Sequence, residues 1–170
     1  MKIGVPSEIK AQESRVGLTP LSVQELTNHG HEVLVQENAG FGAGFENEDY
    51  QKVGALIAPT AGDIFNDSDM IVKVKEPQSE EVNMLRENQL LFTYLHLSAA
   101  PELTKGLVDS KSICIAYETV TDENNRLPLL APMSAVAGRM SIQAGAHCLE
   151  KPQGGRGLLI GGAPGVNPGN

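Results

Sequence analysis

The stretch "TPLSVQELTNHGHEVLVQ", residues 19–36, predicts the fold because it holds the signals of a helix followed directly by a strand. Thr19 is suited to cap the helix, Pro20 suits its first turn and Gly30 ends it. The next residues, "HEVLVQ" at 31–36, have the apolar run of a buried strand. A helix that leads at once into a strand is half of a strand–helix–strand unit.

The same alternation continues on both sides of this stretch. The helix has an apolar face that begins with Leu21 and Leu26, and "KIGVP" at 2–6 is typical of a short buried strand before it. Further strands are expected at 70–76, 90–97 and 112–120, and further helices near 47–53, 61–66, 79–86 and 101–109. Strands alternating with helices predict an α/β fold, with a mostly parallel, Rossmann-like or flavodoxin-like sheet covered by helices on both faces.

A polar segment with two prolines, "TDENNRLPLLAPM" at 121–133, interrupts this rhythm. We therefore predict an N-terminal substrate domain at 1–128. The spacing and alanines of "SAVAGRMSIQAGAHCLEK" at 134–151 predict one long helix, which we place in an interdomain segment at 129–152. Its small residues would let another element pack closely, as in a connecting or interface helix.

The last segment, 153–170, is rich in glycine and ends in "GGRGLLIGGAPGVNPGN". A phosphate-binding loop needs such glycines directly before a helix N-terminus, whose partial positive charge holds the anion. Only four residues follow Val166, so no helix can follow here. We interpret the segment as a loop that leads toward a strand.

Composition restricts the function classes. The chain has 170 residues, a length typical of one domain with a tail, and a formal charge of −8, which argues against nucleic acid and anionic membranes as partners. No apolar run approaches the roughly 20 residues of a membrane span. Cys114 and Cys148 lie in apolar sequence, and we expect both to be buried and unpaired, as in a cytoplasmic protein.

Four ionisable residues follow predicted strands. In parallel α/β sheets, ligands bind at the carboxyl ends of the strands, which is where Arg15, Lys75, His96 and Glu118 are expected. Arginine matches a carboxylate in two-point geometry, and histidine suits proton transfer near neutral pH. Together these residues predict a pocket for a small oxo or amino acid.

Two lysines in one apolar strand are unusual. Strand alternation would place Lys73 and Lys75 on one face, and a buried ammonium needs an acidic partner or an anionic ligand. For Lys73 we favour a solvated head or a structural ion pair, and for Lys75 a functional role. His96 shares its predicted face with apolar residues, where a lone histidine is more often structural than catalytic, but its position in line with Lys75 and Arg15 favours general acid/base work.

Other motifs are poor. "GFGAGF" at 40–45 lacks the strand and helix of a dinucleotide fingerprint, and we interpret it as a turn. His147 and Cys148 are adjacent in a predicted helix, so their side chains diverge, and they do not predict a metal site.

The segments "MKIGVPSEIK", "ESRVGLTP", "MIVKVKEPQ", "LLFTYLHL", "CIAYETV" and "LPLLAPMSAVAGRMSIQAGAHCLEK" carry a family resemblance. In this order they closely resemble the N-terminal part of the family of bacterial alanine dehydrogenase and the NAD(P) transhydrogenase alpha subunit, with "KVKEP" and "TYLHL" closer to alanine dehydrogenase. The resemblance implies NAD-dependent oxidative deamination of L-alanine to pyruvate and ammonia by a homohexamer.

The resemblance also implies roles for single residues. Arg15 and Lys75 would bind the substrate's carboxylate and carbonyl region, and His96 would be the catalytic acid/base. Additional roles fall on Met133 in the substrate pocket, Ser134 against the cofactor, and Tyr94 and Glu118 as supports of the site. The family carries an acidic residue where this chain has Ala135, so a polar contact at that position is not expected here.

The family continues beyond "GGAPGV" into an NAD-binding domain and then completes the substrate domain. We therefore expect this chain, by itself, to hold the substrate side without transferring hydride. Two alternatives stay open: a non-catalytic module that binds a keto or amino acid or associates with longer subunits, and a transhydrogenase-like subunit.

Overall fold

The computed structural model describes residues 1–169. The chain divides into two compact units, Met1–Val120 and Thr121–Asn170, and each is described by itself. The predicted domains 1–128, 129–152 and 153–170 stay predictions.

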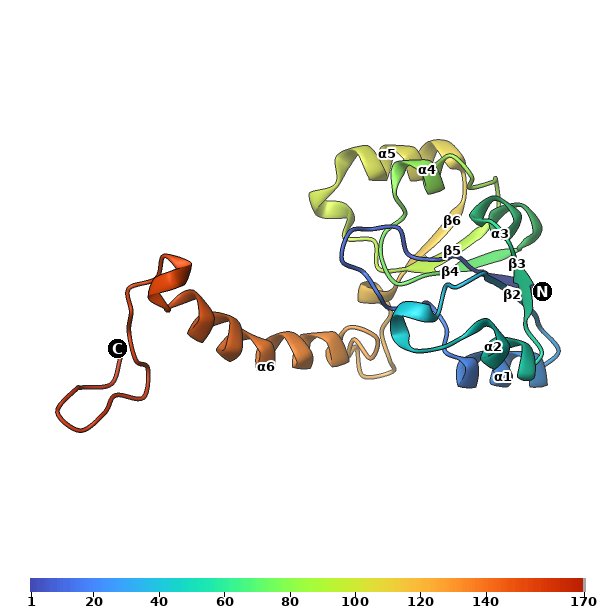
Figure 1. Ribbon diagram of the computed structural model, residues 1–170. Coiled ribbons are helices and arrows are strands. Elements are labelled where there is room, and N and C mark those ends of the chain that lie inside the picture. Colours follow the sequence, from blue (N-terminus) through green and yellow to red (C-terminus); the bar gives the residue numbers. More distant parts are fainter. Residues whose placement is uncertain (170) are drawn as a thin grey trace. The chain divides into compact units, whose positions relative to one another are not determined.

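The first unit is built on one six-stranded, fully parallel sheet (Figure 1). Its strands are β1 (Lys2–Val5), β2 (Glu32–Gln36), β3 (Leu56–Ala58), β4 (Met70–Val72), β5 (Leu90–Thr93) and β6 (Ile113–Ala116). Their order across the sheet is β3-β2-β1-β4-β5-β6. This is the Rossmann order, in which the direction of winding reverses between β1 and β4. The α/β prediction is therefore confirmed.

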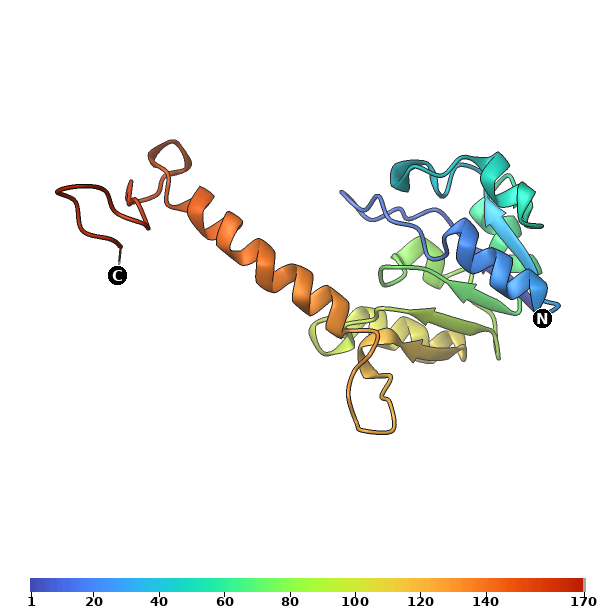
Figure 2. The same ribbon diagram turned by 90° about the horizontal axis from the view of Figure 1, so that it is seen from below.

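Helices cover the two faces of this sheet (Figure 1). One face carries α1 (Pro20–Asn28) and α2 (Asn47–Lys52), and the other carries α3 (Ala61–Asp67), α4 (Ser79–Val82) and α5 (Pro101–Ser110). Single turns of 3₁₀ helix lie at Phe41–Ala43, Leu97–Ala99 and Tyr117–Thr119. Seen from below, α1 lies in front of the sheet, whereas no helix of this unit covers β5 and β6 on that side (Figure 2). Ile113 and Ile115 are accordingly exposed.

The alternation of side chains in β2 divides the core in two. Val33 and Val35 pack with Val23 of α1 on one face, and Leu34 packs with Phe65 of α3 on the other. Because successive side chains in a strand point to opposite faces, one continuous apolar run can serve both layers. This pattern explains the continuous apolar runs from which the buried strands were predicted.

The helix α1 begins and ends as predicted. The Thr19 hydroxyl accepts a hydrogen bond from the Ser22 N–H at 3.3 Å, Pro20 is the first helical residue, and Gly30 follows the helix with φ of 80°. The prediction that Leu21 belongs to the buried face was wrong, because it is 75% exposed and Val23 fills the core instead. Leu26 is partly buried against that core.

Strand predictions erred in extent. β3 was missed because it is a three-residue edge strand in which only Ala58 is buried, too short for an alternation signal. The strands predicted at 70–76, 90–97 and 112–120 are each shorter, since regular pairing ends where the chain begins to form the loops at the carboxyl edge.

The helix predicted at 79–86 is only the four-residue α4. Tertiary contacts end it: the Arg86 guanidinium donates to the Ser68 carbonyl at 2.7 Å, and the Gln89 amide donates to the Phe65 and Ser68 carbonyls at 2.7 and 2.8 Å. These bonds satisfy carbonyls at the end of α3, and they draw the chain out of helical geometry.

The second unit contains α6 (Ala131–Cys148) and a 3₁₀ turn at Lys151–Gln153. The predicted long helix is present, three residues earlier than expected at each end, and none of its residues is buried. Within residues 1–169, no helix is long and apolar enough to cross a membrane. Both cysteines are unpaired, but the expected burial was wrong for Cys148, which is exposed, and incomplete for Cys114, which is half-buried.

Candidate functional site

The loop after β1 lies against the end of β4, at the reversal point of the sheet. Gly17 makes this approach possible: a Cβ at this position would lie 2.5 Å from the Val72 carbonyl oxygen. Only glycine leaves room for the backbone of β4 there. The loop that carries Arg15 is thereby held beside the segment that carries Lys75.

Lys75 is partly buried, and its backbone is held by Glu8 of the loop after β1. The Val74 N–H donates to Glu8 Oε1 at 2.6 Å, and the Lys75 N–H lies 3.4 Å from both carboxylate oxygens. Pairing with β5 continues on the other side, since the Tyr94 N–H donates to the Val74 carbonyl at 3.2 Å. A carboxylate therefore takes the place of a neighbouring strand.

Lys73 forms a buried ion cluster with Glu8 and Glu81, which confirms the structural ion pair among the two predictions for this residue. Its Nζ lies 3.2 Å from Glu8 Oε2 and 3.0 Å from Glu81 Oε1. All three side chains are at most 2% exposed. Burial raises the pKa of Glu81 above its usual value, although the Lys73 ammonium acts in the opposite direction. The cluster joins the loop after β1, the end of β4 and α4.

Arg15 is held by Glu13 in a two-point ion pair. Its Nε lies 2.8 Å from Oε1 of Glu13, and its Nη2 lies 2.6 Å from Oε2. The hydrogen bond from Arg15 lowers the pKa of Glu13 from 4.5 to about 2 against the opposing effect of burial, and the positive charge of Lys75 contributes in the same direction as Arg15. Arg15 and Lys75 thus act on the same carboxylate.

His96 follows β5 in a left-handed conformation, with φ of 51°. The Glu118 carboxylate accepts a hydrogen bond from the backbone N–H of His96 at 2.7 Å and lies 3.9 Å from Nδ1 of the His96 ring. Tyr94 stacks on the imidazole with 4° between the ring planes and a centroid separation of 5.9 Å. Burial by itself raises the pKa of Glu118. Hydrogen bonds from the backbone N–H groups of His96 and Leu95, together with the His96 charge, lower it by more, so the net shift of this pKa is downward.

The aromatic residues continue behind this stack. The ring of Tyr117 contacts two other rings edge to face, with centroid separations of 5.0 Å to Tyr94 and 4.3 Å to Phe92. Burial raises its pKa, with smaller contributions from Tyr94 and Glu8. Tyr94 also contributes to the raised pKa of Arg15, after the dominant effect of Glu13. Tyr94 therefore lies within electrostatic reach of Arg15 while its ring stacks on His96.

Five of the seven predicted site residues lie in the first unit, at the carboxyl edge of the sheet: Arg15, Lys75, Tyr94, His96 and Glu118. Met133 and Ser134 belong to α6 in the second unit. Within that helix, the Ser134 N–H donates to the Leu130 carbonyl at 3.0 Å. The roles of all seven stay predictions.

A pocket of 150 Å³ lies beside Arg15, between the loops after β1 and β2. Glu8, Glu13, Ser14 and Asn38 are among its lining residues, whereas Lys75 and His96 are not. At about 30 Å³ per water molecule, the pocket has room only for a few waters or a very small solute.

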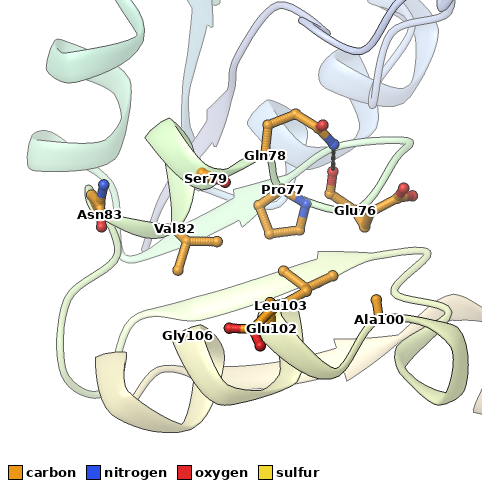
Figure 3. A pocket seen from close by; sticks show the side chains of 10 residues that line it. All are labelled: Glu76, Pro77, Gln78, Ser79, Val82, Asn83, Ala100, Glu102, Leu103 and Gly106. Atoms are coloured by element: carbon orange, nitrogen blue, oxygen red, sulfur yellow. Dashed lines mark hydrogen bonds between the residues drawn. The ribbon is translucent and has the colours of Figure 1, made fainter.

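A larger pocket of 440 Å³ lies between α4 and α5 (Figure 3). The Gln78 amide donates to the Glu76 carbonyl at its upper wall, and Val82 and Leu103 face each other across it. None of the predicted site residues lines it. The predicted site therefore does not coincide with this larger pocket, and its location stays a prediction.

The described residues do not fit a dinucleotide. The β1–α1 connection, where Rossmann domains carry their glycine fingerprint, reads "PSEIKAQESRVGLT" at 6–19, and its one glycine approaches Val72. The glycine-rich segment 154–169 forms turns and an isolated bridge between Ala163 and Val166, with no helix among its described residues. Nor do residues 1–169 include a group of three or more histidine, cysteine or acidic residues placed to hold a metal ion.

Sequence reasoning missed Glu8 and Glu13. Both lie in the irregular polar stretch after β1, where neither periodicity nor a motif distinguishes one carboxylate from another. The one usable signal was indirect: the requirement that a buried lysine at position 73 meet an acidic partner.

Comparison with known proteins agrees with this architecture. The sequence model described as "Alanine dehydrogenase/PNT, N-terminal domain" matches residues 4–137. The chain is 57% identical to alanine dehydrogenase of Halomonas elongata over 168 residues, and 54% identical to that of Bacillus subtilis over 169 residues. These matches cover 99% of this chain and 45% and 44% of the two relatives.

Solved structures agree as well. A structure of L-alanine dehydrogenase matches 99% of this chain and 46% of its own, with a TM-score of 0.86 and 55% identity. The transhydrogenase from Sinorhizobium meliloti matches 69% of this chain and 35% of its own, with a TM-score of 0.66 and 25% identity. The chain thus spans less than half the length of the relatives it matches. With its parallel sheet and the family model matched over 4–137, the chain belongs to the alanine dehydrogenase/PNT family, of which it carries the N-terminal domain.

Proposed function

We propose that this chain is the substrate-side part of an NAD-dependent alanine dehydrogenase, which converts L-alanine to pyruvate and ammonia. The observation that carries the proposal is the grouping of Arg15, Lys75 and His96 at one edge of the sheet, in a chain 57% identical to a protein named alanine dehydrogenase. Those relatives are more than twice as long, so the complete reaction is proposed for the longer protein only.

Arg15 and Lys75 bind the substrate's carboxylate and carbonyl region. The guanidinium supplies planar hydrogen-bond donors in an orientation that Glu13 defines, and the ammonium of Lys75 is a compact charge that acts electrostatically on the same carboxylate. Two cations that converge on one small anion orient it as well as hold it, which is the requirement for a reaction at the adjacent carbon.

His96 moves the proton. Glu118 lies on the Nδ1 side of the ring, and Tyr94 stacks on its face, so the opposite nitrogen, Nε2, is directed away from Glu118. A histidine oriented in this way donates a proton to the substrate oxygen or nitrogen in one direction and accepts it in the other. Met133 lines the substrate pocket in the same proposal.

The nicotinamide cofactor supplies hydride when it is bound. The described residues do not form a dinucleotide cradle, and Ser134 is proposed only as a contact to the cofactor. A homohexameric assembly and a cytoplasmic location belong to the same proposal for the longer protein. By itself, the 170-residue chain is proposed to bind the keto acid without transferring hydride.

Calorimetric titration of the purified chain with pyruvate, and separately with NADH, tests this proposal. We expect heat of binding with pyruvate, loss of that heat in Lys75→Ala, and no heat with NADH. Lys52→Ala, which changes an exposed lysine of α2, is the control and should bind as the unmodified chain does. Pyruvate binding that survives both Lys75→Ala and Arg15→Ala would place the keto-acid site elsewhere.

A further inference from the structure

We propose that Glu8 is a positioning residue for Lys75. Its carboxylate holds the main chain at Val74 and Lys75, and the buried Lys73–Glu81 pair holds that carboxylate. The inference rests on the proposed function only in taking Lys75 as a ligand-binding residue. The positioning itself is a property of the fold.

The contact reaches Lys75 through the backbone. Glu8 Oε1 accepts the Val74 N–H at 2.6 Å, a short distance typical of a hydrogen bond to a charged acceptor. Both oxygens lie 3.4 Å from the Lys75 N–H, so one carboxylate spans two successive amides. The direction of the Lys75 side chain follows from the peptide planes that these bonds orient.

The need for such an acceptor arises from the topology. β4 lies between β1 and β5. β1 ends at Val5, whereas the chain that follows β4 continues to pair with the β5 side at Lys73 and Val74. The N–H groups of Val74 and Lys75 then lack a strand partner on the β1 side, and a buried unpaired N–H is costly. Glu8, three residues after β1, supplies the missing acceptor.

The carboxylate is itself buried, with its side chain 2% exposed, and a lone buried charge would be strongly unfavourable. Lys73 Nζ offsets that charge at 3.2 Å and also lies 3.0 Å from Glu81 Oε1. Glu81 Oε2 in turn accepts the Gln78 N–H at 2.8 Å, at the start of α4. The segment that carries Lys75 is therefore held at two places, at residues 74–75 and at Gln78.

Residue-resolved amide hydrogen exchange on the 170-residue chain tests the positioning. In Glu8→Gln, which keeps the size of the side chain and removes its charge, we expect protection at the Val74 and Lys75 amides to fall about tenfold, with core amides such as Val35 unchanged. The matched control is Glu76→Gln, since Glu76 pairs with Lys10 and accepts neither amide. Unchanged protection at 74–75 in Glu8→Gln overturns the proposal.

A second variant covers the case in which Glu8→Gln unfolds the chain. Glu8→Gln combined with Lys73→Met and Glu81→Gln removes all three charges of the buried cluster, which proteins tolerate better than the loss of one partner. We expect this triple variant to fold and to show the same local loss at Val74 and Lys75. Equal loss over the whole sheet would instead assign the cluster to general stability and contradict positioning.

Pyruvate affinity separates this inference from the proposed function. If Glu8 acts through Lys75, Glu8→Gln weakens pyruvate binding severalfold in the unmodified chain but has no further effect in Lys75→Ala. Additive losses contradict the inference. If the unmodified chain binds no pyruvate, the proposed function of this chain fails, and the exchange measurement still decides whether Glu8 positions Lys75.

Discussion

The carboxylate of Glu13 binds the guanidinium of Arg15 at two points, with Oε1 2.8 Å from Nε and Oε2 2.6 Å from Nη2. Glu13 is 7% exposed and Arg15 is 47% exposed, so the acid is anchored in the protein and the base extends from it toward solvent. The pair presents a cation at the carboxyl edge in one fixed orientation, although the two residues are only two positions apart in a loop.

This pair should make stability depend on acid pH. The pKa of Glu13 is lowered in the folded state to about 2, from 4.5, so its contribution is present above about pH 4.5 and is lost as the pH falls toward 2. Because Arg15 is half exposed, solvent screening limits the contribution to about 1–2 kcal/mol. Urea unfolding at about pH 6 and about pH 3 should show a smaller pH-dependent loss in Glu13→Gln than in the unmodified chain.

The control for that measurement is Glu32→Gln, since Glu32 pairs with Lys2 on the surface, with both side chains nearly half exposed. Its pH dependence should follow that of the unmodified chain. An identical acid-induced loss in Glu13→Gln would show that the Arg15 pair does not contribute to folding.

Lys73→Met should be strongly destabilising, because it leaves the carboxylates of Glu8 and Glu81 buried without their shared cation. Removing one partner of a buried ion pair costs about 3–5 kcal/mol. Burial already raises the pKa of Glu81, and loss of the Lys73 charge raises it further, so the carboxyl can take up a proton. A carboxyl whose pKa is raised in the folded state makes the folded protein less stable as the pH rises and the carboxyl loses its proton. The penalty of the substitution should therefore be larger at about pH 8 than at about pH 5.

Unfolding free energies of Lys73→Met and of the unmodified chain at those two pH values check this prediction. Lys52→Met, at an exposed position, should cost little at either pH. A penalty that is the same at both pH values would argue that the buried carboxyls do not take up protons when Lys73 is removed.

Gly17→Ala should weaken both folding and ligand binding. The added Cβ would meet the Val72 carbonyl oxygen at 2.5 Å, so the loop that carries Arg15 must move away from β4. Overpacking of this kind costs about 1–3 kcal/mol. Gly138→Ala is the matched control, since no atom lies within 4 Å of the new Cβ and alanine favours α6. Thermal unfolding and pyruvate titration of both variants test the prediction, which fails if Gly17→Ala binds pyruvate as Gly138→Ala does.

Substitutions of His96 should separate its backbone role from its ring. The residue adopts φ of 51°, which asparagine tolerates and β-branched residues do not. His96→Asn should retain stability, whereas His96→Val should lose about 1–3 kcal/mol. Both remove the imidazole, so under the proposed function neither should support proton transfer in the longer protein. Equal stability of the two variants would show that the left-handed conformation is not required in solution.

Much of the fold was predictable because its signals are local. Thr19, Pro20 and Gly30 mark α1 through capping, a preset φ and a positive φ, each of which depends on a few neighbouring residues. The helix predicted at 79–86 failed for the opposite reason. Arg86 and Gln89 bind carbonyls of residues about twenty positions away, and no local pattern records that competition.

In the candidate site, too, the residues with a local signal were predicted and those that depend on tertiary contacts were not. Arg15, Lys75, His96 and Glu118 were predicted to lie at one edge because each follows a strand, and parallel strands bring their carboxyl ends to one edge. Glu8 and Glu13 were not found, since any of several loop carboxylates could have met the cations. Leu21 was misassigned because a face begun by two leucines does not specify which of its members reaches the core.

The sequence by itself determined the alternation of strands and helices, the family, and the chemical types gathered at the carboxyl edge, because these depend on periodicity and on the order of elements along the chain. Only the tertiary structure decided which carboxylate holds which cation. Glu8 lies 65 positions from Lys73, and Glu81 reaches that lysine from α4, so their pairing depends on the order β1-β4-β5 in space. Burial then makes the pairing obligatory, because a charge excluded from water requires a partner at hydrogen-bonding distance.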